Sequence, residues 1–451
     1  MKAVSEVKQY DVAIIGAGPA GLAAAHQLHD AGKNVVVIEK YLWGGTCPNY
    51  GCDPKKILLG AVEAKEFTEY LSGSGIDGQV NINWSDLMAR KNQYTDGIST
   101  GTEQSLTASD IDHIAGEASF IDEQTAVIHR HGQEVITVFA TDWVLAVGQR
   151  PAQLSFPGAE LTVDSEQFLS LPELSDEVVI IGGGFVAIEF ASIAAVAGAK
   201  VSLVVRGDRL LKSFDETMVD SLMDQLDDRG VQMYFGTEVT EITSADGGLE
   251  ATLSFGNTLS AGLIVRAAGR VGNHDTLGLE NAHVQFSEQG ILVDHYLRTS
   301  NPHVYAVGDV ANSPVPKITP LASFESQHVA NEILGEEQAI AYPAMPVVVY
   351  GTPKLAQTGV TTETADTDRY TVNDLDITSW YTSYRQGEPA ARVKTVINGD
   401  GQIVGASVLS THADELINYL SSAINQGLTK EAVSQQLTAY PSVASDLTYF
   451  F

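Results

Sequence analysis

The chain has 451 residues, and because a typical domain has about 150, we expect two to four domains. Its 26 Lys and Arg stand against 57 Asp and Glu, and the net charge of −31 argues against nucleic acid or an anionic membrane as partner. The N-terminal segment lacks an apolar signal region, and no apolar run approaches the length of a membrane span. Two cysteines are too few for a secreted disulfide scaffold, so we expect a cytoplasmic protein.

The first forty residues predict a β-α-β unit with a dinucleotide-binding turn. A strand pattern at 10–15 runs into the glycine-rich turn 16–21, an Ala-rich helix and a second strand that ends at Glu39. The glycines permit, in order, a tight turn, close approach to a pyrophosphate and close helix packing: Gly16, Gly18 and Gly21. The helix N-terminus would donate amide hydrogens to the pyrophosphate, and Glu39 would accept from ribose hydroxyls.

The same architecture returns in the middle of the chain. A strand pattern at 177–181 leads into the glycine-rich turn 182–187, a helix and a strand at 200–205. No acid ends this second strand, which is followed instead by three cations: Arg206, Arg209 and Lys212. An acid would bind the ribose of NAD, whereas cations favour the 2′-phosphate of NADP. The pattern therefore predicts NADPH rather than NADH, the alternative being a solvated loop.

Three further glycine motifs and a change of pattern complete the organisation. Turns at Gly148 and Gly269 flank the second unit and mark crossings between domains, and a later strand ends at Gly308-Asp309, where an acid can bind a cofactor's polyol chain. The last hundred residues predict strands and then helices, which is the order of an α+β domain. The strands are expected at 347–350, 369–384, 391–397 and 403–409, and the helices from Ala413 and Lys430.

The two cysteines form the clearest chemical signal. Cys47 and Cys52 lie in one loop directly after the first unit, and four intervening residues let their sulfurs meet across one helical turn. Cys52 is expected at a helix N-terminus, where the dipole and the cations of Lys55 and Lys56 lower a thiol pKa. Two cysteines without clustered histidines do not complete a metal site, so no metal is expected. The loop predicts a redox-active disulfide, the alternative being inert buried thiols.

Taken together, these motifs resemble the pyridine nucleotide–disulfide oxidoreductases of the class that includes glutathione reductase, dihydrolipoamide dehydrogenase and mercuric reductase. The resemblance covers essentially the whole chain. It implies an α/β fold with two Rossmann-like domains, for FAD and NAD(P), plus a C-terminal α+β dimerisation domain, and hence a homodimer. The implied domains are the first part of the FAD domain, the NAD(P) domain, the second part of the FAD domain and the interface domain, at 1–150, 151–272, 273–341 and 342–451.

The resemblance also implies residue roles. Cys52 would donate charge to the flavin, Cys47 would exchange with substrate, and Glu189 would pair with Lys55 or Lys56, a choice that spacing leaves open. The implied cofactor-binding positions are the motif residues and their neighbours: Gly16, Gly18, Pro19, Ala20, Gly21, Glu39, Lys40, Gly45, Thr46, Gly148, Gly182, Gly184, Val186, Arg206, Arg209, Lys212, Gly269, Arg270, Gly308 and Asp309.

One position departs from the family pattern. The C-terminal signature has His-Pro and, later, a Glu that orients the histidine, whereas this chain has Tyr440-Pro441 with Ser445 and Asp446 at and after the glutamate position. A phenol, with a pKa of about 10, donates a hydrogen bond but is a poor base near neutral pH. Tyr440 would therefore serve as a proton donor, or the acceptor needs no protonation, or Tyr440 only packs.

The sequence thus predicts an enzyme that passes electrons from NADPH through FAD to the Cys47–Cys52 disulfide and on to a small disulfide of the glutathione type. Two alternatives stay open at this point. One is an NADPH-dependent flavin reductase of metal ions, quinones or oxygen, and the other is a non-catalytic FAD-binding redox sensor.

Overall fold

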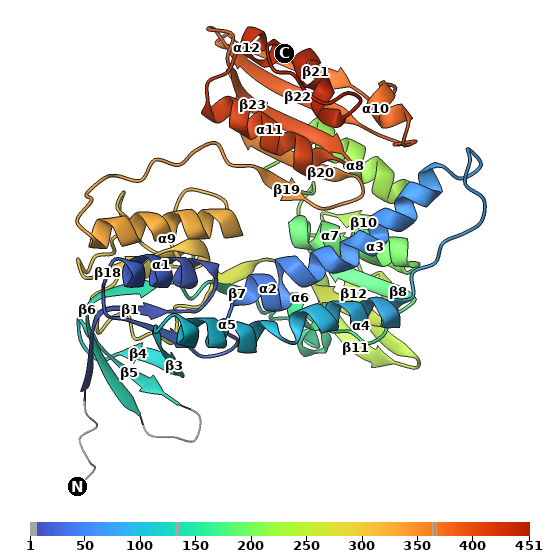
Figure 1. Cartoon of the computed structure of the whole chain (residues 1–451). Coiled ribbons are helices and arrows are strands. Elements are labelled where there is room, and N and C mark those ends of the chain that lie inside the picture. The colour runs from blue at the N-terminus through green and yellow to red at the C-terminus, as the bar shows by residue number, and fades with distance from the viewer. Residues whose placement is uncertain (1–6, 131–134, 363–364, 367) are drawn as a thin grey trace. The chain divides into compact units, whose positions relative to one another are not determined.

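The computed structural model of the chain describes residues 7–130, 135–362, 365–366 and 368–451 (Figure 1). The chain divides into two compact units, and each is assembled from three separate stretches. The first unit contains residues up to Lys56, 89–152 and 270–341, and the second contains 57–88, 153–269 and 342–451. Residues 57–88 therefore group with the second unit, and the finer domain boundaries expected from the sequence stay predictions.

A seven-stranded sheet forms the centre of the first unit, with the order β3-β2-β1-β6-β5-β4 and with β18 also paired to β6. β1, β2, β3, β6 and β18 run parallel, whereas β4 and β5 are antiparallel additions. The strands are Val7–Ile15, Val35–Glu39, Asp112–Ala115, Glu117–Phe120, Thr125–His129, Ile136–Leu145 and, for β18, Val304–Ala306. Two small antiparallel pairs add β7 (Gln149–Pro151) with β15 (Arg270–Gly272) and β16 (Phe286–Ser287) with β17 (Gly290–Ile291).

Helices α1 (Pro19–Asp30) and α9 (Thr319–Ile333) lie side by side on this sheet (Figure 1). Leu28 of α1 and Val329 of α9 are buried in one apolar cluster with strand residues such as Val12. The small alanine side chains of α1 let this helix approach the sheet closely. The unit also holds α2 (Thr46–Tyr50), the start of α3 (Cys52–Tyr70), the end of α4 (Trp84–Thr95) and α5 (Ile98–Ala108). The carboxyl ends of β1, β2 and β6 meet beside α1, where parallel α/β sheets bind their ligands.

The second unit contains three sheets. A parallel sheet has the order β10-β9-β8-β14, a three-stranded antiparallel sheet follows the order β11-β12-β13, and the C-terminal antiparallel sheet has the order β19-β20-β23-β22-β21. β8 to β14 are Glu177–Ile181, Lys200–Val205, Gln232–Phe235, Val239–Ala245, Gly248–Leu253, Thr258–Ala261 and Leu263–Arg266. β19 to β23 are Val347–Val349, Lys354–Gly359, Tyr370–Asp376, Arg392–Asn398 and Ile403–Ser410.

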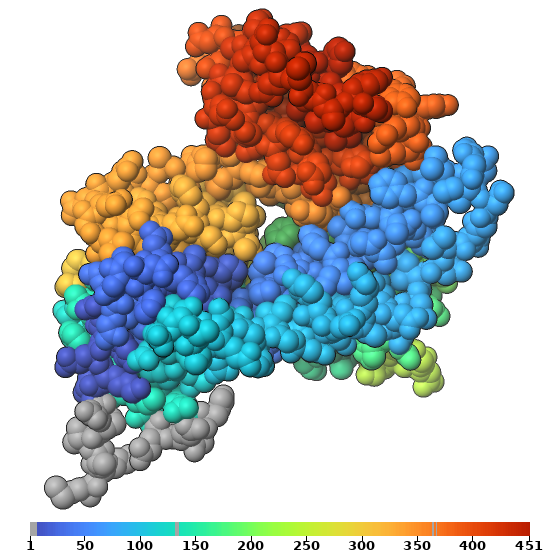
Figure 2. Space-filling view, viewed as in Figure 1, coloured from blue at the N-terminus to red at the C-terminus, as the bar shows by residue number. Residues whose placement is uncertain are grey.

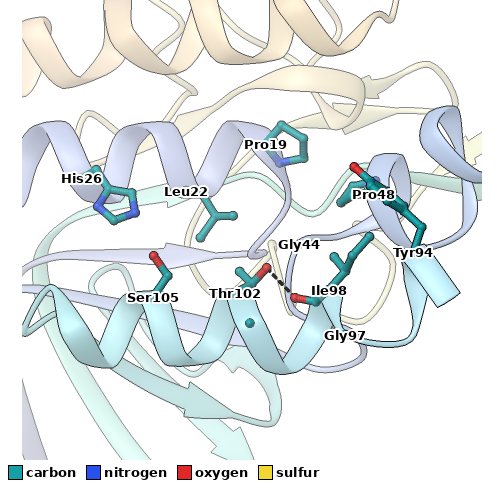
Figure 3. A pocket seen from close by; sticks show the side chains of 11 residues that line it. Pro19, Leu22, His26, Gly44, Pro48, Tyr94, Gly97, Ile98, Thr102 and Ser105 are labelled. Atoms are coloured by element: carbon teal, nitrogen blue, oxygen red, sulfur yellow. Dashed lines mark hydrogen bonds between the residues drawn. The ribbon is translucent and has the colours of Figure 1, made fainter.

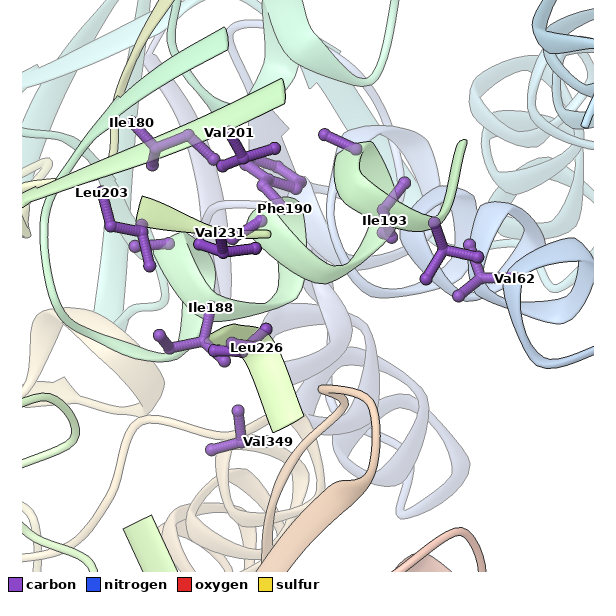
Figure 4. Packing of buried hydrophobic residues seen from close by; sticks show 14 of the residues in the cluster. Val62, Ile180, Ile188, Phe190, Ile193, Val201, Leu203, Leu226, Val231 and Val349 are labelled. Atoms are coloured by element: carbon purple, nitrogen blue, oxygen red, sulfur yellow. The ribbon is translucent and has the colours of Figure 1, made fainter. Parts of the chain in front are cut away.

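The helices of the second unit enclose its largest apolar core. α7 (Phe185–Ala197) is hydrophobic almost throughout, and Ile188, Phe190 and Ile193 pack with β8, β9 and the residues after Ile57 (Figure 4). The remaining helices are α6 (Ser165–Phe168), α8 (Glu216–Asp228), α10 (Tyr381–Tyr384), α11 (Ala413–Asn425) and α12 (Lys430–Ser434). Within the residues that the structure describes, none of the helices combines the length and the apolar character that crossing a bilayer requires.

The C-terminal sheet corrects two predictions made from the sequence. The single strand expected at 369–384 is wrong, because β21 stops at Asp376, whose side chain accepts a hydrogen bond from the Thr378 amide and starts a turn toward α10. The sequence pattern also missed β20, which lies between β19 and β23. It pairs with the adjacent β19 on one side and with β23, about fifty residues later, on the other, so its place in the sheet depends in part on a partner distant in sequence.

Candidate active site

The first glycine turn has a geometry that only glycine fits. Gly16 has φ +107°, and a Cβ there would lie 2.3 Å from the Ala146 carbonyl oxygen at the end of β6. A Cβ on Gly21 would lie 1.8 Å from the Gly16 carbonyl oxygen. Pro19 and Ala20 form the first turn of α1, and Gly18 at its N-cap provides no side-chain hydrogen bond. The first amides of α1 are therefore not capped by a side chain, and such amides can donate to a phosphate group.

Glu39 lies at the end of β2, beside the same turn. Its Oε2 accepts a hydrogen bond from the Ala17 amide and its Oε1 from the Tyr41 amide, both at 2.8 Å. Each carboxylate oxygen keeps a second lone pair, so the fixed carboxylate can still accept from ribose hydroxyls. The neighbouring Lys40 forms an exposed ion pair with Glu117 at 3.1 Å.

The cysteine loop packs directly on the glycine turn. Gly45 has φ +69°, and a Cβ on it would lie 2.7 Å from the Gly18 Cα. Thr46 then begins α2, which carries Cys47. The structure therefore brings Gly18, Gly45, Thr46 and Cys47 together, as a site that joins a dinucleotide to a redox pair requires.

The Gly308-Asp309 motif belongs to the same end of the sheet. Gly308 has φ +68°, and a Cβ on it would lie 3.5 Å from that of Ala20 in α1. Its amide donates to the buried Glu325 carboxylate at 2.7 Å, a contact that sequence reasoning missed. Burial raises the pKa of Asp309, and the charges of Arg270 and Lys317 oppose this increase.

The glycine turns at Gly148 and Gly269 lie close to the points where the chain passes from one compact unit to the other. Gly148 has φ +63° and Gly269 has φ +118°. Gly148 precedes β7, and the Arg270 guanidinium donates to the Gln149 carbonyl oxygen at 2.5 Å in the β7–β15 pair.

The two cysteines differ in chemistry. Cys47 lies in α2 and Cys52 begins α3, and both are free thiols that share a hydrogen bond. That bond from Cys47, together with the Thr319 hydroxyl and the charges of Lys55 and Lys56, lowers the pKa of Cys52 to about 6 against an opposing effect of burial. The same bond raises the pKa of Cys47. Near neutral pH the pair is thus a Cys52 thiolate that accepts from a Cys47 thiol.

Thr319 is a site residue that the sequence analysis missed. Its Oγ1 lies 3.7 Å from the Cys52 sulfur. It starts α9 and is followed by Pro320, an arrangement typical of the first turn of a helix. The Thr-Pro pair was the sequence signal for a helix start at this position, which brings the first turn of α9 to the cysteines.

A pocket adjoins the cysteine loop in the first unit. It has a volume of about 520 Å³ and lies between α1, α5 and the cysteine loop (Figure 3), whose surfaces are seen in Figure 2 as dark blue and cyan spheres next to each other. Its lining residues are Pro19, Leu22, His26, Gly44, Pro48, Tyr94, Gly97, Ile98, Gly101, Thr102 and Ser105. The Tyr94 hydroxyl donates to Asp53, the residue after Cys52, at 3.4 Å. We name this space the α1–α5 pocket.

The second glycine turn repeats the first. Gly182 has φ +145°, and a Cβ on it would lie 2.3 Å from the Ala267 carbonyl oxygen. Gly184 at the N-cap of α7 provides no side-chain hydrogen bond, and Val186 is half-buried in the first helical turn. The buried Glu189 accepts from the Tyr350 amide at 3.0 Å. Because Lys55 and Lys56 belong to the first unit, their pairing with Glu189 stays a prediction.

The three cations after β9 divide into two kinds. The Arg209 guanidinium donates to the Phe214 carbonyl oxygen at 2.7 Å and so holds the loop together. Arg206 and Lys212 are exposed, with side chains that are 86% and 66% accessible, and each forms a surface ion pair, Arg206 with Glu238 at 3.8 Å and Lys212 with Asp208 at 3.1 Å. Lys212 lies across Gly207, where a Cβ would be 3.1 Å from its Nζ. The loop therefore presents two cations to solvent at the end of β9.

Tyr440 is 79% exposed in the C-terminal part of the second unit. Two polar residues that follow it in sequence, Ser445 and Asp446, are engaged elsewhere. The Asp446 carboxylate accepts a hydrogen bond from Thr382, and the Ser445 hydroxyl donates to the Ser442 carbonyl oxygen at 2.6 Å.

The donor set of each turn fits a dinucleotide. The first has uncapped amides, a glycine cradle that a Cβ would fill and a carboxylate for ribose, which suit FAD. The second has the same cradle with cations in place of the carboxylate, which suits a pyridine nucleotide. No group of three or more His, Cys, Asp or Glu that suits a metal ion exists among the described residues.

Comparison with known proteins agrees with this geometry. The family model described as pyridine nucleotide-disulphide oxidoreductase matches residues 10–332, and that of the family's dimerisation domain matches residues 345–449. The chain belongs to this family, as the sequence motifs predicted, and its α/β fold with a C-terminal dimerisation domain is confirmed.

Individual relatives cover the chain almost completely. A glutathione reductase from Burkholderia cepacia is 30% identical over 97% of both chains, and a dihydrolipoyl dehydrogenase from Geobacillus stearothermophilus is 29% identical over 95% of this chain and 93% of its own. A Cu(II) complex of a cysteine-to-serine mutant of the HOCl-induced flavoprotein disulfide reductase RclA from Escherichia coli has a TM-score of 0.89, with 25% identity and 99% of both chains covered. The chain is therefore a flavoprotein disulfide reductase that uses FAD and a pyridine nucleotide, and its dimerisation domain implies a homodimer.

Proposed function

We propose that this enzyme is an NADPH-dependent reductase of a small disulfide, with Cys47 and Cys52 as its redox pair. The observation that carries the proposal is the asymmetry of the two sulfurs. Cys52 is the stabilised thiolate, whereas Cys47 keeps its proton and lies in α2 next to Pro48, which lines the α1–α5 pocket. This division suits one sulfur that faces the flavin and one that exchanges with substrate. The proposed location is the cytoplasm, where thiols persist.

The preference for NADPH is supported by the loop after β9. Arg206 and Lys212 present exposed cations where the first unit has the carboxylate of Glu39. A 2′-phosphate would accept charge-assisted hydrogen bonds from both cations, in place of their present partners Glu238 and Asp208. Arg209 contributes by fixing the shape of the loop rather than by facing solvent.

The thiol chemistry follows from the two sulfurs. When bound, FAD supplies the two-electron link between nicotinamide and disulfide. The Cys47 sulfur loses its proton and attacks the substrate disulfide, so that a mixed disulfide forms and one substrate thiolate leaves. The Cys52 thiolate then attacks Cys47, which releases the second substrate thiolate and closes the Cys47–Cys52 bond. One leaving thiolate takes up the proton that Cys47 released, and the other takes one proton from an acid beside it.

We assign the donation of one of these protons to Tyr440 of the partner subunit. Its exposed phenol lies in the dimerisation domain and is not engaged by Ser445 or Asp446. A phenol is suited to donating a hydrogen bond to a thiolate, but not to removing a proton near neutral pH. Tyr440→Phe should therefore lower the rate of disulfide reduction by about 10²-fold, the scale of general acid catalysis, with NADPH-driven flavin reduction preserved. An unchanged rate would show that Tyr440 only packs.

The test of the main proposal is an anaerobic titration with NADPH that follows the flavin spectrum before and after a disulfide is added. A long-wavelength charge-transfer band should appear in the wild type, vanish on adding disulfide, and be absent in Cys52→Ser. Cys47→Ser should keep the band but reduce no disulfide. If the wild-type flavin bleaches without the band, the cysteines are outside the electron path and the proposal fails.

A second candidate function is reduction of a metal ion, favoured by the similarity to a flavoprotein whose structure is a Cu(II) complex. The variant with both cysteines replaced by serine separates the two. A disulfide reductase loses turnover in this variant, whereas an enzyme that reduces metal ions, quinones or oxygen directly at the flavin retains it. A redox sensor would oxidise NADPH slowly with every acceptor.

A further inference from the structure

The α1–α5 pocket adjoins the sulfur that exchanges with substrate. Pro48 follows Cys47 directly in α2 and lines the pocket together with Gly44 of the same loop. Tyr94, on the wall opposite His26 (Figure 3), hydrogen-bonds the residue after Cys52. A small disulfide held here would lie beside the residue that follows Cys47, and the pocket and Cys47 belong to the same unit.

The lining of this pocket carries almost no positive charge. Four of its side chains are apolar, namely Pro19, Leu22, Pro48 and Ile98. Thr102 and Ser105 offer hydroxyls, and the Thr102 hydroxyl already donates to the Ile98 carbonyl oxygen at 2.9 Å (Figure 3). No lysine or arginine is among the lining residues, and His26 is the one side chain there that gains a positive charge on protonation.

A negative charge lies directly behind one wall of the pocket, whereas the cations of Lys55 and Lys56 act on the Cys52 sulfur and do not line the pocket. Asp53 accepts from the Tyr94 hydroxyl, and its charge raises the pKa of Tyr94. The whole chain carries a further excess of negative charge, with a net value of −31. Glutathione disulfide has more carboxylates than ammonium groups near neutral pH. Its carboxylates would therefore lose water in this pocket without gaining a cationic partner from the lining residues of this protomer, which disfavours binding.

We propose that the α1–α5 pocket selects small disulfides without net negative charge, and that it discriminates against glutathione disulfide. This inference rests on the proposed disulfide-reductase function and specifies its substrate class. Apolar walls beside two hydroxyls suit a compact neutral or zwitterionic disulfide, for which burial requires no cationic partner.

The test compares kcat/KM for hydroxyethyl disulfide, cystine and glutathione disulfide at low ionic strength. We expect kcat/KM for the uncharged and the zwitterionic disulfide to exceed that for glutathione disulfide by about tenfold or more, because burying an unpaired carboxylate lowers affinity by at least about tenfold. Added salt should narrow this gap, because it screens the repulsion from the acidic surface.

A gain-of-charge variant provides the decisive arm. Ser105→Arg places a cation in the pocket and should raise kcat/KM for glutathione disulfide, relative to hydroxyethyl disulfide, by about tenfold. Gln104→Arg is the matched control, because it adds the same charge at the adjacent exposed position of α5 but does not line the pocket. His26→Arg tests the same idea from α1, so that the measurement stands even if one variant loses its flavin.

The outcomes separate the inference from the function on which it rests. Equal or faster turnover of glutathione disulfide by the wild type, or equal effects of S105R and Q104R, would overturn the proposed selectivity while leaving the enzyme a disulfide reductase. A wild type that reduces none of the disulfides, although NADPH reduces its flavin, would overturn both.

Discussion

The two β-α-β units of this chain share one backbone design and differ in the residues after their second strands. In each, a Cβ on the first glycine would lie 2.3 Å from a carbonyl oxygen at the end of another strand, which is Ala146 for Gly16 and Ala267 for Gly182. In each, the helix begins without a side-chain cap. The glycine geometry therefore specifies a dinucleotide, but not which one.

The difference lies at the end of the second strand of each unit. Glu39 points its carboxylate back at its own turn, through the amides of Ala17 and Tyr41. Val205 is followed instead by the exposed Arg206, which belongs to a loop that Arg209 holds in shape. The comparison teaches that a few residues at the strand end set the preference for the ribose that each unit binds.

The largest effects are expected from adding a side chain to one glycine turn at a time, which tests whether the two turns bind different dinucleotides. Gly16→Ala should abolish flavin binding and lower the free energy of unfolding by about 3 kcal/mol or more, because the Cβ meets a carbonyl at a positive φ. Gly182→Ala should instead keep the flavin and lose its reduction by NADPH. Flavin content, NADPH-driven bleaching and thermal unfolding measure both.

Gly60→Ala is the matched control for these variants. Gly60 is exposed within α3, and a Cβ there would meet nothing within 4 Å. This substitution should stabilise the protein by about 0.5–1 kcal/mol, because alanine favours the helix. Retention of flavin by Gly16→Ala would show that the first turn does not bind FAD.

The next largest effect is expected when the second β-α-β unit is given an acid at the end of its second strand, as the first has in Glu39. Arg206→Glu should reduce kcat/KM for NADPH by on the order of 100-fold, because a charge-assisted hydrogen bond is lost and repulsion is added. It should also improve the use of NADH. Lys200→Glu makes the same charge change at the opposite end of β9 and should leave the NADPH to NADH ratio unaltered. Equal effects of the two variants would contradict the assigned role of Arg206.

The smallest effect concerns the redox pair, which only the first unit carries. Removing the hydroxyl in Thr319→Val takes a donor from the Cys52 thiolate and should raise the pKa of Cys52 from about 6 by about one unit. The charge-transfer band and the alkylation rate by iodoacetamide should then be lost on acidification at a higher pH than in the wild type. Thr319→Ser keeps the hydroxyl and should restore the wild-type pH profile. A profile unmoved by Thr319→Val would show that Cys47 and the lysines suffice.

Much of the fold was predictable from the sequence because its signals are local. The strand and glycine turn of the first β-α-β unit were expected at 10–15 and 16–21, followed by an Ala-rich helix, and the structure has β1 and α1 at Val7–Ile15 and Pro19–Asp30. The second β-α-β unit also matches its prediction, since its glycine turn and apolar strands lie within one stretch of chain. The cysteine loop was also local, and the start of α3 at Cys52 confirms the expected helix N-terminus.

The features that the sequence did not reveal depend on contacts between distant segments. Thr319 and Glu325 reach Cys52 and Gly308 only because α9 packs beside α1. The α1–α5 pocket likewise assembles from three segments that share no motif. Arg209 looked like its neighbours Arg206 and Lys212, and only the folded loop turns its guanidinium toward Phe214.

The anchoring role of Arg209 has an evolutionary consequence. Because one cation maintains the loop, the exposed positions 206 and 212 contribute little to the packing of the second unit. Substitutions there should change the choice of cofactor without a loss of folding, as surface changes generally cost little stability. A lineage with this loop can thus move between reductant pools in a few mutational steps, and the rest of the electron path is inherited unchanged.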